Sequence, residues 1–121
     1  GFDVNQSKEK ASDACRALED KKGEEVTVID ISGVSCLADY FIIANGENSN
    51  QVQAMVDNVE EEMAKAGYHP AQIEGYQAAR WVLLDYKDVV VHVFSKEDRR
   101  FYDLERIWRD GKFISEKELE A

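Results

Sequence analysis

The sequence has little of what marks membrane, secreted or disulfide-built proteins. It contains two cysteines, Cys15 and Cys36, in 121 residues, which define no disulfide framework and favour a reducing compartment. No apolar run approaches the ~20 residues of a membrane span, and no signal-peptide pattern opens the chain, so we expect a cytoplasmic protein. No internal repeat or low-complexity linker divides it. We therefore expect a single domain over residues 1–121, with its core over about 6–110.

Basic residues are also scarce. The chain has 15 Lys and Arg against 25 Asp and Glu, for a formal net charge of -10. The imbalance lies in residues 23–80, which contain ten acids and two bases. Such a surface repels phosphate, so we expect no free nucleic acid as a ligand. It attracts a basic protein, with an association rate that falls as the salt concentration rises.

Enzyme motifs are mostly missing. Residues 33–37 begin like a nucleophile elbow, but they lack its final glycine and lie between two expected strands. The sequence has no phosphate loop and no dinucleotide fingerprint. Neither His69 nor His92 has a metal-type spacing to a cysteine. We therefore expect no catalytic residues, no metal and no cofactor.

The pattern of apolar residues predicts helices around a sheet. Helices are expected over residues 6–21, from Asn48 to Gly67, and from Ser95 to Gly111. The expected strands lie at 26–31, 39–44, 80–86 and 89–94, with a further short one near Ile73. Residues 112–121 are highly charged and are expected to be a frayed tail. The order α-β-β-α-(β)-β-β-α predicts an α+β fold, with helices flanking a mixed β-sheet.

The strand pair at 80–94 is the best-defined hairpin. If residues 87 and 88 form a two-residue turn, Trp81 and Asp85 share a sheet face with His92. A three-residue turn would reverse this facing. Asp85 and His92 would be diagonal neighbours, and the carboxylate would raise the pKa of the imidazole. Such a pair is either an acid–base pair or a structural hydrogen bond, and the lack of a nearby nucleophile favours the structural alternative.

Side chains around the hairpin suit a binding surface as well as a core. Tryptophan is enriched in binding hot spots but also in small cores, so Trp81 is compatible with both. Tyr102 lies beside the apolar stripe of the last helix, where a half-exposed anchor is expected. Arg99 and Arg100 begin that helix, where the dipole disfavours cations. They are expected to pair with acids or a partner, or to belong to a solvated charge cluster.

Several of these residues together resemble the ribosomal silencing factor (Iojap) family. The resemblance covers roughly Val26 to Trp108. It is carried by these motifs: Trp81-x-x-x-Asp85, Val91-His92-Val93 and Arg100-x-Tyr102-x-Leu104-Glu105-x-x-Trp108, with Asp39-Tyr40-Phe41-Ile42-Ile43 and Glu74-Gly75 upstream.

The resemblance implies a function. Members of the family bind the fourteenth protein of the large ribosomal subunit, at the face that meets the small subunit. There they block subunit joining and lower translation when nutrients are scarce, and organellar relatives act in large-subunit assembly. The fold resembles that of nucleotidyltransferases without the catalytic carboxylates. In agreement, Asp39 has no second acid two residues on.

Three alternatives therefore remain. The chain is a silencing factor, a remnant nucleotidyltransferase that uses Asp39 with another acid and magnesium, or an organellar assembly factor. For the first, the expected partner-binding residues are Trp81, Asp85, His92, Arg100, Tyr102 and Glu105. Trp81 would contribute apolar area, and Asp85 and Glu105 would meet basic side chains. A homodimer that competes with ribosome binding is also compatible with the sequence.

Overall fold

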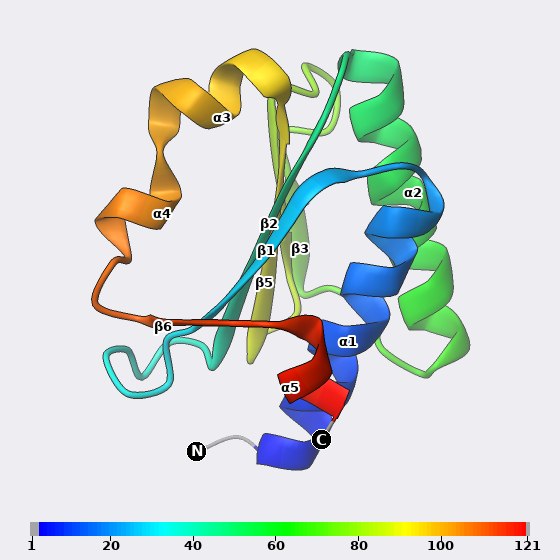
Figure 1. The fold of residues 1–121 in the computed structure, drawn as a ribbon. Helices are drawn as coiled ribbons and strands as arrows, with labels where there is room; N and C mark the ends of the chain where they lie inside the picture. The colour runs from blue at the N-terminus through cyan, green and yellow to red at the C-terminus, as the bar shows by residue number, and fades with distance from the viewer. Residues whose placement is uncertain (1–2, 121) are drawn as a thin grey trace.

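The computed structural model describes residues 3–120, with Phe101 described for its backbone only, and shows a sheet between two layers of helices (Figure 1). The sheet is mixed, and its six strands lie in the order β3-β4-β5-β2-β1-β6. The strands are β1 (Glu24–Asp30), β2 (Tyr40–Gly46), β3 (Gln72–Glu74), β4 (Trp81–Asp85), β5 (Val89–Ser95) and β6 (Lys112–Ile114). The expected α+β class and mixed sheet are confirmed.

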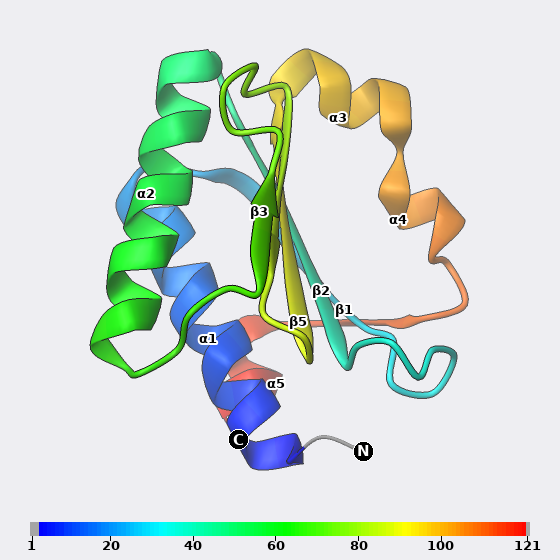
Figure 2. The ribbon, with the colours of Figure 1, turned by 180° about the vertical axis from the view of Figure 1, so that it is seen from behind.

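The helices divide unequally between the two faces of the sheet. Two long helices, α1 (Val4–Asp20) and α2 (Ser49–Lys65), cover one face, and α5 (Glu116–Glu120) lies beside α1. The other face carries only two short helices, α3 (Lys96–Tyr102) and α4 (Leu104–Ile107), as the view from behind also shows (Figure 2). No helix within residues 3–120 is long and apolar enough to cross a membrane.

The two long helices bury the apolar residues that their sequences predict, although α1 begins at Val4, two residues before its expected start. The Asp3 side chain caps α1 by accepting from the backbone N–H groups of residues 5 and 6, and Asn48 caps α2 by accepting from that of Gln51. The predicted apolar stripes are buried against the sheet; they consist of Ala11, Ala14, Cys15 and Leu18 in α1 and Val52, Met55, Val56, Val59 and Met63 in α2. These contacts form the larger of two core clusters.

The strand pairing confirms the expected register. β1 and β2 are antiparallel, as the short connection between them predicts. β2 and β5 are parallel, which makes the sheet mixed. In the β4–β5 hairpin Leu83 pairs with His92, and the Tyr86 N–H donates to the Val89 carbonyl at 2.9 Å. Residues 87 and 88 therefore form the two-residue turn.

The expectation of a frayed C-terminal tail is wrong. β6 pairs with the outer edge of β1, with Phe113 opposite Ile29. α5 then packs on α1, and its Leu119 is 4% exposed in the main core. The strand has only three residues and lies among charged residues, so the local sequence does not predict it. Its stability comes from pairing with β1, more than eighty positions earlier in the chain. Of the expected tail, only residue 121 lies outside the described part of the chain.

The last predicted helix is interrupted. Asp103 adopts the left-handed conformation (φ 45°, ψ 57°) and separates α3 from α4. The break turns Leu104 onto the sheet, where it is 7% exposed, and leaves Ile107 exposed to solvent. The apolar stripe expected for this helix consists of Phe101, Leu104, Ile107 and Trp108. It is therefore only partly buried, and the Phe101 side chain lies outside the described part of the chain.

A candidate docking surface on the sheet

The sheet face under α3 and α4 is only partly covered. Directly paired residues of neighbouring strands share a face, and so the register defines this one. It carries Gln72, Glu74, Trp81, Leu83, Asp85, Val90, His92, Phe94, Phe41, Ile43, Ile29 and Phe113. Beneath α3 and α4 the face is buried, as Ile29, Ile43 and Phe94 show. Toward β3 it is open. We call this part the open strip: Gln72, Glu74, Leu83, Asp85 and Val90, all exposed or half-buried.

Between the open strip and the short helices lies a group of rings. We call it the aromatic cluster: Phe41, Trp81, His92, Phe94, Tyr102 and Trp108. Trp81 is half-buried, with its ring centroid 5.1 Å from Phe94 and 4.7 Å from Tyr102. Tyr102 is 41% exposed, so it caps the cluster while keeping part of its ring at the surface. The cluster thus combines core packing with an accessible rim.

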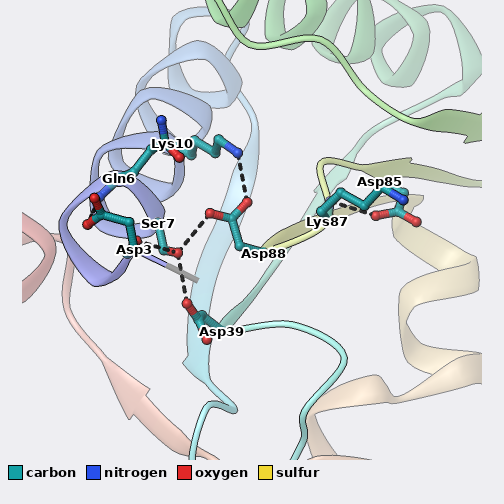
Figure 3. A network of polar contacts seen from close by, with 8 residues as sticks. All are labelled: Asp3, Gln6, Ser7, Lys10, Asp39, Asp85, Lys87 and Asp88. Atoms are coloured by element: carbon teal, nitrogen blue, oxygen red, sulfur yellow. Dashed lines mark hydrogen bonds and ion pairs between the residues drawn. The ribbon is translucent and has the colours of Figure 1, made fainter. Parts of the chain in front are cut away.

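The expected pairing of Asp85 with His92 is wrong, although the two residues share the predicted face. The His92 Nδ1 accepts a hydrogen bond from the Trp81 indole N–H at 3.1 Å, so the ring is neutral and carries its hydrogen on Nε2. The Asp85 side chain turns back instead and accepts from the Lys87 backbone N–H at 2.8 Å (Figure 3). Burial lowers the pKa of His92 to about 4, the opposite of the expected direction.

The other two predicted contact residues lie at a different place. Arg100 and Glu105 line a cavity of about 260 Å³ between the short helices and the ends of β1 and β2. Arg100 is exposed, but the Glu105 carboxylate accepts a hydrogen bond from the Arg99 guanidinium at 2.7 Å. Of the two alternatives for Arg99, pairing with an acid is therefore confirmed, because this side chain is 7% exposed and not solvated.

The neighbouring acid of α3 also has a structural role. Arg80 donates two hydrogen bonds to the Asp98 carboxylate, at 3.1 and 3.0 Å, and the Ser95 hydroxyl donates a third. These bonds, those from Arg80 first, lower the pKa of Asp98. They attach the start of α3 to the loop before β4, next to Trp81.

The sequence did not single out every residue of this surface. Leu83 and Val90 lie within the two expected strands of the hairpin, but nothing in the sequence marks them as surface residues. Glu74 becomes part of the surface only because β3 pairs with β4, and a three-residue edge strand leaves almost no signal in the sequence. Half-buried and buried residues alternate along β4 in the structure, but four of its five residues are apolar, so its sequence shows no alternation that would reveal an open face.

Asp39, the candidate metal-binding acid, belongs to a network beside the start of α1 and the β4–β5 turn (Figure 3). The Ser7 hydroxyl lies 2.8 Å from both the Asp39 and the Asp88 carboxylates, and the Lys10 amine donates to Asp88 at 2.8 Å. A cation of the chain itself thus pairs with the second acid. Within residues 3–120, no group of three or more His, Cys, Asp or Glu side chains is placed to hold a metal ion. The network ties the start of α1 to β2 and to the β4–β5 turn.

The comparisons with known proteins point to one family. The family model described as "Ribosomal silencing factor during starvation" matches residues 4–121. A ribosomal silencing factor of Halalkalibacterium halodurans is 43% identical over 101 residues, which cover 84% of this chain and 86% of that protein. One of Bacillus subtilis is 42% identical over 98 residues, or 81% and 83% of the two chains.

The fold is shared as well. A crystal structure of a Chromobacterium violaceum protein superposes with a TM-score of 0.81 at 34% identity, covering 88% of this chain and 87% of that one. The family model spans nearly the whole chain, including β6 and α5, which the motifs alone did not reach. This chain belongs to the ribosomal silencing factor family.

Proposed function

We propose that this protein binds the large ribosomal subunit through the open strip and the aromatic cluster, and so blocks joining of the small subunit. The docking partner is the fourteenth protein of the large subunit, at the intersubunit face, and the effect is to lower translation when nutrients are scarce. The protein acts in the bacterial cytoplasm. The observation that carries the proposal is a partly uncovered sheet face, bordered by half-buried rings, on a chain of net charge -10.

The chemistry of the surface suits a basic protein partner. Leu83, Val90 and the exposed part of Trp81 offer apolar area, and burying such area favours association by about 25 cal/mol per Å². Glu74 and Asp85 flank that area with negative charge. Acids at the rim of an interface raise the association rate with a basic partner more than the final affinity.

Occupancy alone explains the inhibition. A domain seated on the intersubunit face fills space that the small subunit needs, so no bond has to be made or broken. A stable complex of this type buries roughly 800 Å² on each partner. Such an interface has about 20–30 residues on each side, so a partner would also cover outward residues of the short helices, such as Tyr102 and Ile107. A second copy of the chain on the same surface would compete with the ribosome.

Co-sedimentation with bacterial large subunits tests this function. The protein should pellet with isolated large subunits, more weakly as salt rises, and should prevent added small subunits from joining them. Trp81→Ala should weaken binding by ~2 kcal/mol or more, about 30-fold. Leu37→Ala is the matched control, because Leu37 is an apolar residue 80% exposed on the β1–β2 loop.

Two results would contradict the proposal. One is unhindered association of the two subunits at saturating concentrations of the protein. The other is a wild-type protein that stays in the supernatant with isolated large subunits at low salt. If folded Trp81→Ala bound as tightly as Leu37→Ala, Trp81 would be a core residue only.

A further inference from the structure

The two helices that border the docking surface are too short to hold their own positions. α3 has seven residues and α4 has four. Isolated helices shorter than about 12 residues are marginal in water. Asp103 between them is left-handed, and its side chain makes no capping hydrogen bond to α4. The angle between α3 and α4 must therefore be fixed by contacts outside the helices.

Arg99 supplies such contacts from a buried position. Its side chain is 7% exposed, and its two terminal nitrogens donate to acceptors on β1, β2 and α4. The acceptors are the carbonyls of Glu24 (3.4 Å) and Glu25 (2.6 Å), Asn45 Oδ1 (3.1 Å), Thr27 Oγ1 (2.9 Å) and Glu105 Oε2 (2.7 Å). One guanidinium thus joins α3, α4 and two strands.

Strand β1 has a bulge at the position where the Arg99 side chain binds. The register of β1 against β2 shifts between Glu24 and Thr27, and Glu25 has a φ of 49°. This bulge interrupts the β1–β2 ladder where two carbonyls accept from Arg99. A guanidinium directs several N–H groups in a fixed plane, whereas an ammonium places three donors on one atom. Lysine is therefore a poor substitute here.

We propose that Arg99 is the positioning residue of the docking surface, and that Glu105 acts through Arg99 instead of touching the partner. The inference rests on the proposed function. The Arg99–Glu105 ion pair spans the break at Asp103 and holds α4 against α3. That arrangement places Tyr102 over Trp81 at one end of the aromatic cluster. At the other end it places the Trp108 ring with its centroid 4.9 Å from that of the Phe41 ring.

The first test uses the free protein. Amide hydrogen exchange in residues 104–108 should become about tenfold faster in Glu105→Ala, because a local contact is lost while α1 and α2 keep their protection. Glu105→Gln should restore most of the protection, since its amide oxygen still accepts from Arg99. Glu61→Gln is the control, as Glu61 pairs with Lys65 on the exposed side of α2. Unchanged exchange in Glu105→Ala would overturn the proposal.

The second test measures affinity for large subunits. Glu105→Ala and Arg99→Lys should each bind about tenfold more weakly, and the double variant should bind no more weakly than the weaker single one. Glu105→Gln should bind nearly as well as wild type. A direct salt bridge to the partner predicts otherwise, since Glu105→Gln would then be as weak as Glu105→Ala, and that result would overturn the proposal.

The two proposals fail in different ways. If the wild-type protein does not bind large subunits, the proposed function is wrong, and exchange in residues 104–108 still decides the role of Arg99. If Arg99→Lys does not fold, the two Glu105 variants decide alone, because Glu105 is partly exposed and its loss leaves the sheet intact. If wild type binds and Glu105→Ala binds equally well, Arg99 does not position this surface.

Discussion

Acidification should destabilise this protein through His92. The side chain is 4% exposed, and burial lowers its pKa from the usual 6.5 to about 4. Between these values the unfolded chain binds a proton at this position and the folded chain does not. The contribution of His92 to stability is therefore complete above pH 6.5 and is lost as the pH falls toward 4.

The size of the effect follows from the difference in pKa. One pKa unit corresponds to about 1.4 kcal/mol, so His92 should lower the free energy of unfolding by about 3 kcal/mol between pH 7 and pH 4. This is a large part of the ~5–15 kcal/mol by which domains are usually stable. Glu116 changes stability in the opposite direction over part of this range, because its pKa is raised to about 6. The contribution of the imidazole is therefore obtained from the difference in the free energy of unfolding between wild type and a His92 variant at each pH.

The assay is urea unfolding followed by tryptophan fluorescence, at half-unit steps from pH 4 to pH 7.5. His92→Gln should flatten the decline toward acid, while His69→Gln, at an exposed position, should leave it unchanged. Parallel curves for wild type and His92→Gln would refute the reasoning. So would an NMR titration of the His92 ring with a midpoint near 6.5.

Three further predictions concern stability in the same assay. Asp103→Gly should raise the free energy of unfolding by ~0.5–1 kcal/mol, because glycine adopts φ 45° without strain, and Asp103→Val should lower it. Leu119→Ala should lower it by ~2–3 kcal/mol, since Leu119 is 4% exposed, and a change below about 0.5 kcal/mol would mean that α5 is not docked in solution. Burial raises the pKa of Glu116 to about 6, and the hydrogen bond that protonated Glu116 donates to the Glu19 carboxylate adds to this. Its stabilisation is therefore present below pH 4.5 and is lost as the pH rises through 6. After allowance for solvent screening, Glu116→Gln should be about 1 kcal/mol more stable than wild type at pH 7, and no difference would contradict this.

The hairpin was predictable because its signals are local. Apolar residues run along both strands, and a two-residue turn fixes the pairing, so the facing of Trp81, Asp85 and His92 follows from the sequence alone. The partner of His92 did not follow. Its two diagonal neighbours, Trp81 and Asp85, are equally placed by the register. Asp85 does not bond to His92 because its carboxylate accepts a hydrogen bond from the Lys87 backbone N–H within the turn. Trp81 is therefore the neighbour that bonds to His92.

The features that the sequence did not reveal depend on distant contacts. β6 is a strand only because β1 lies beside it, and α5 is helical where Leu119 enters the core. The break at Asp103 lies within a continuous helical pattern. It is stable because Leu104 reaches the sheet and because the Arg99–Glu105 ion pair closes across it. Periodicity along the chain contains no information about either contact.

The proposed silencing by occupancy is favoured by a surface that is already in its binding form, and two polar contacts beneath this surface are already made. The Trp81 indole N–H is bonded to His92, and Glu105 is bonded to Arg99, before any partner arrives. Docking therefore needs little rearrangement of these groups, and less of the binding free energy is lost to ordering the surface. It follows that a substitution that makes α3 and α4 more mobile should weaken binding even when no residue that contacts the partner is changed. Substitutions on the exposed side of α2 should leave binding unchanged, because none of these bonds involves that helix.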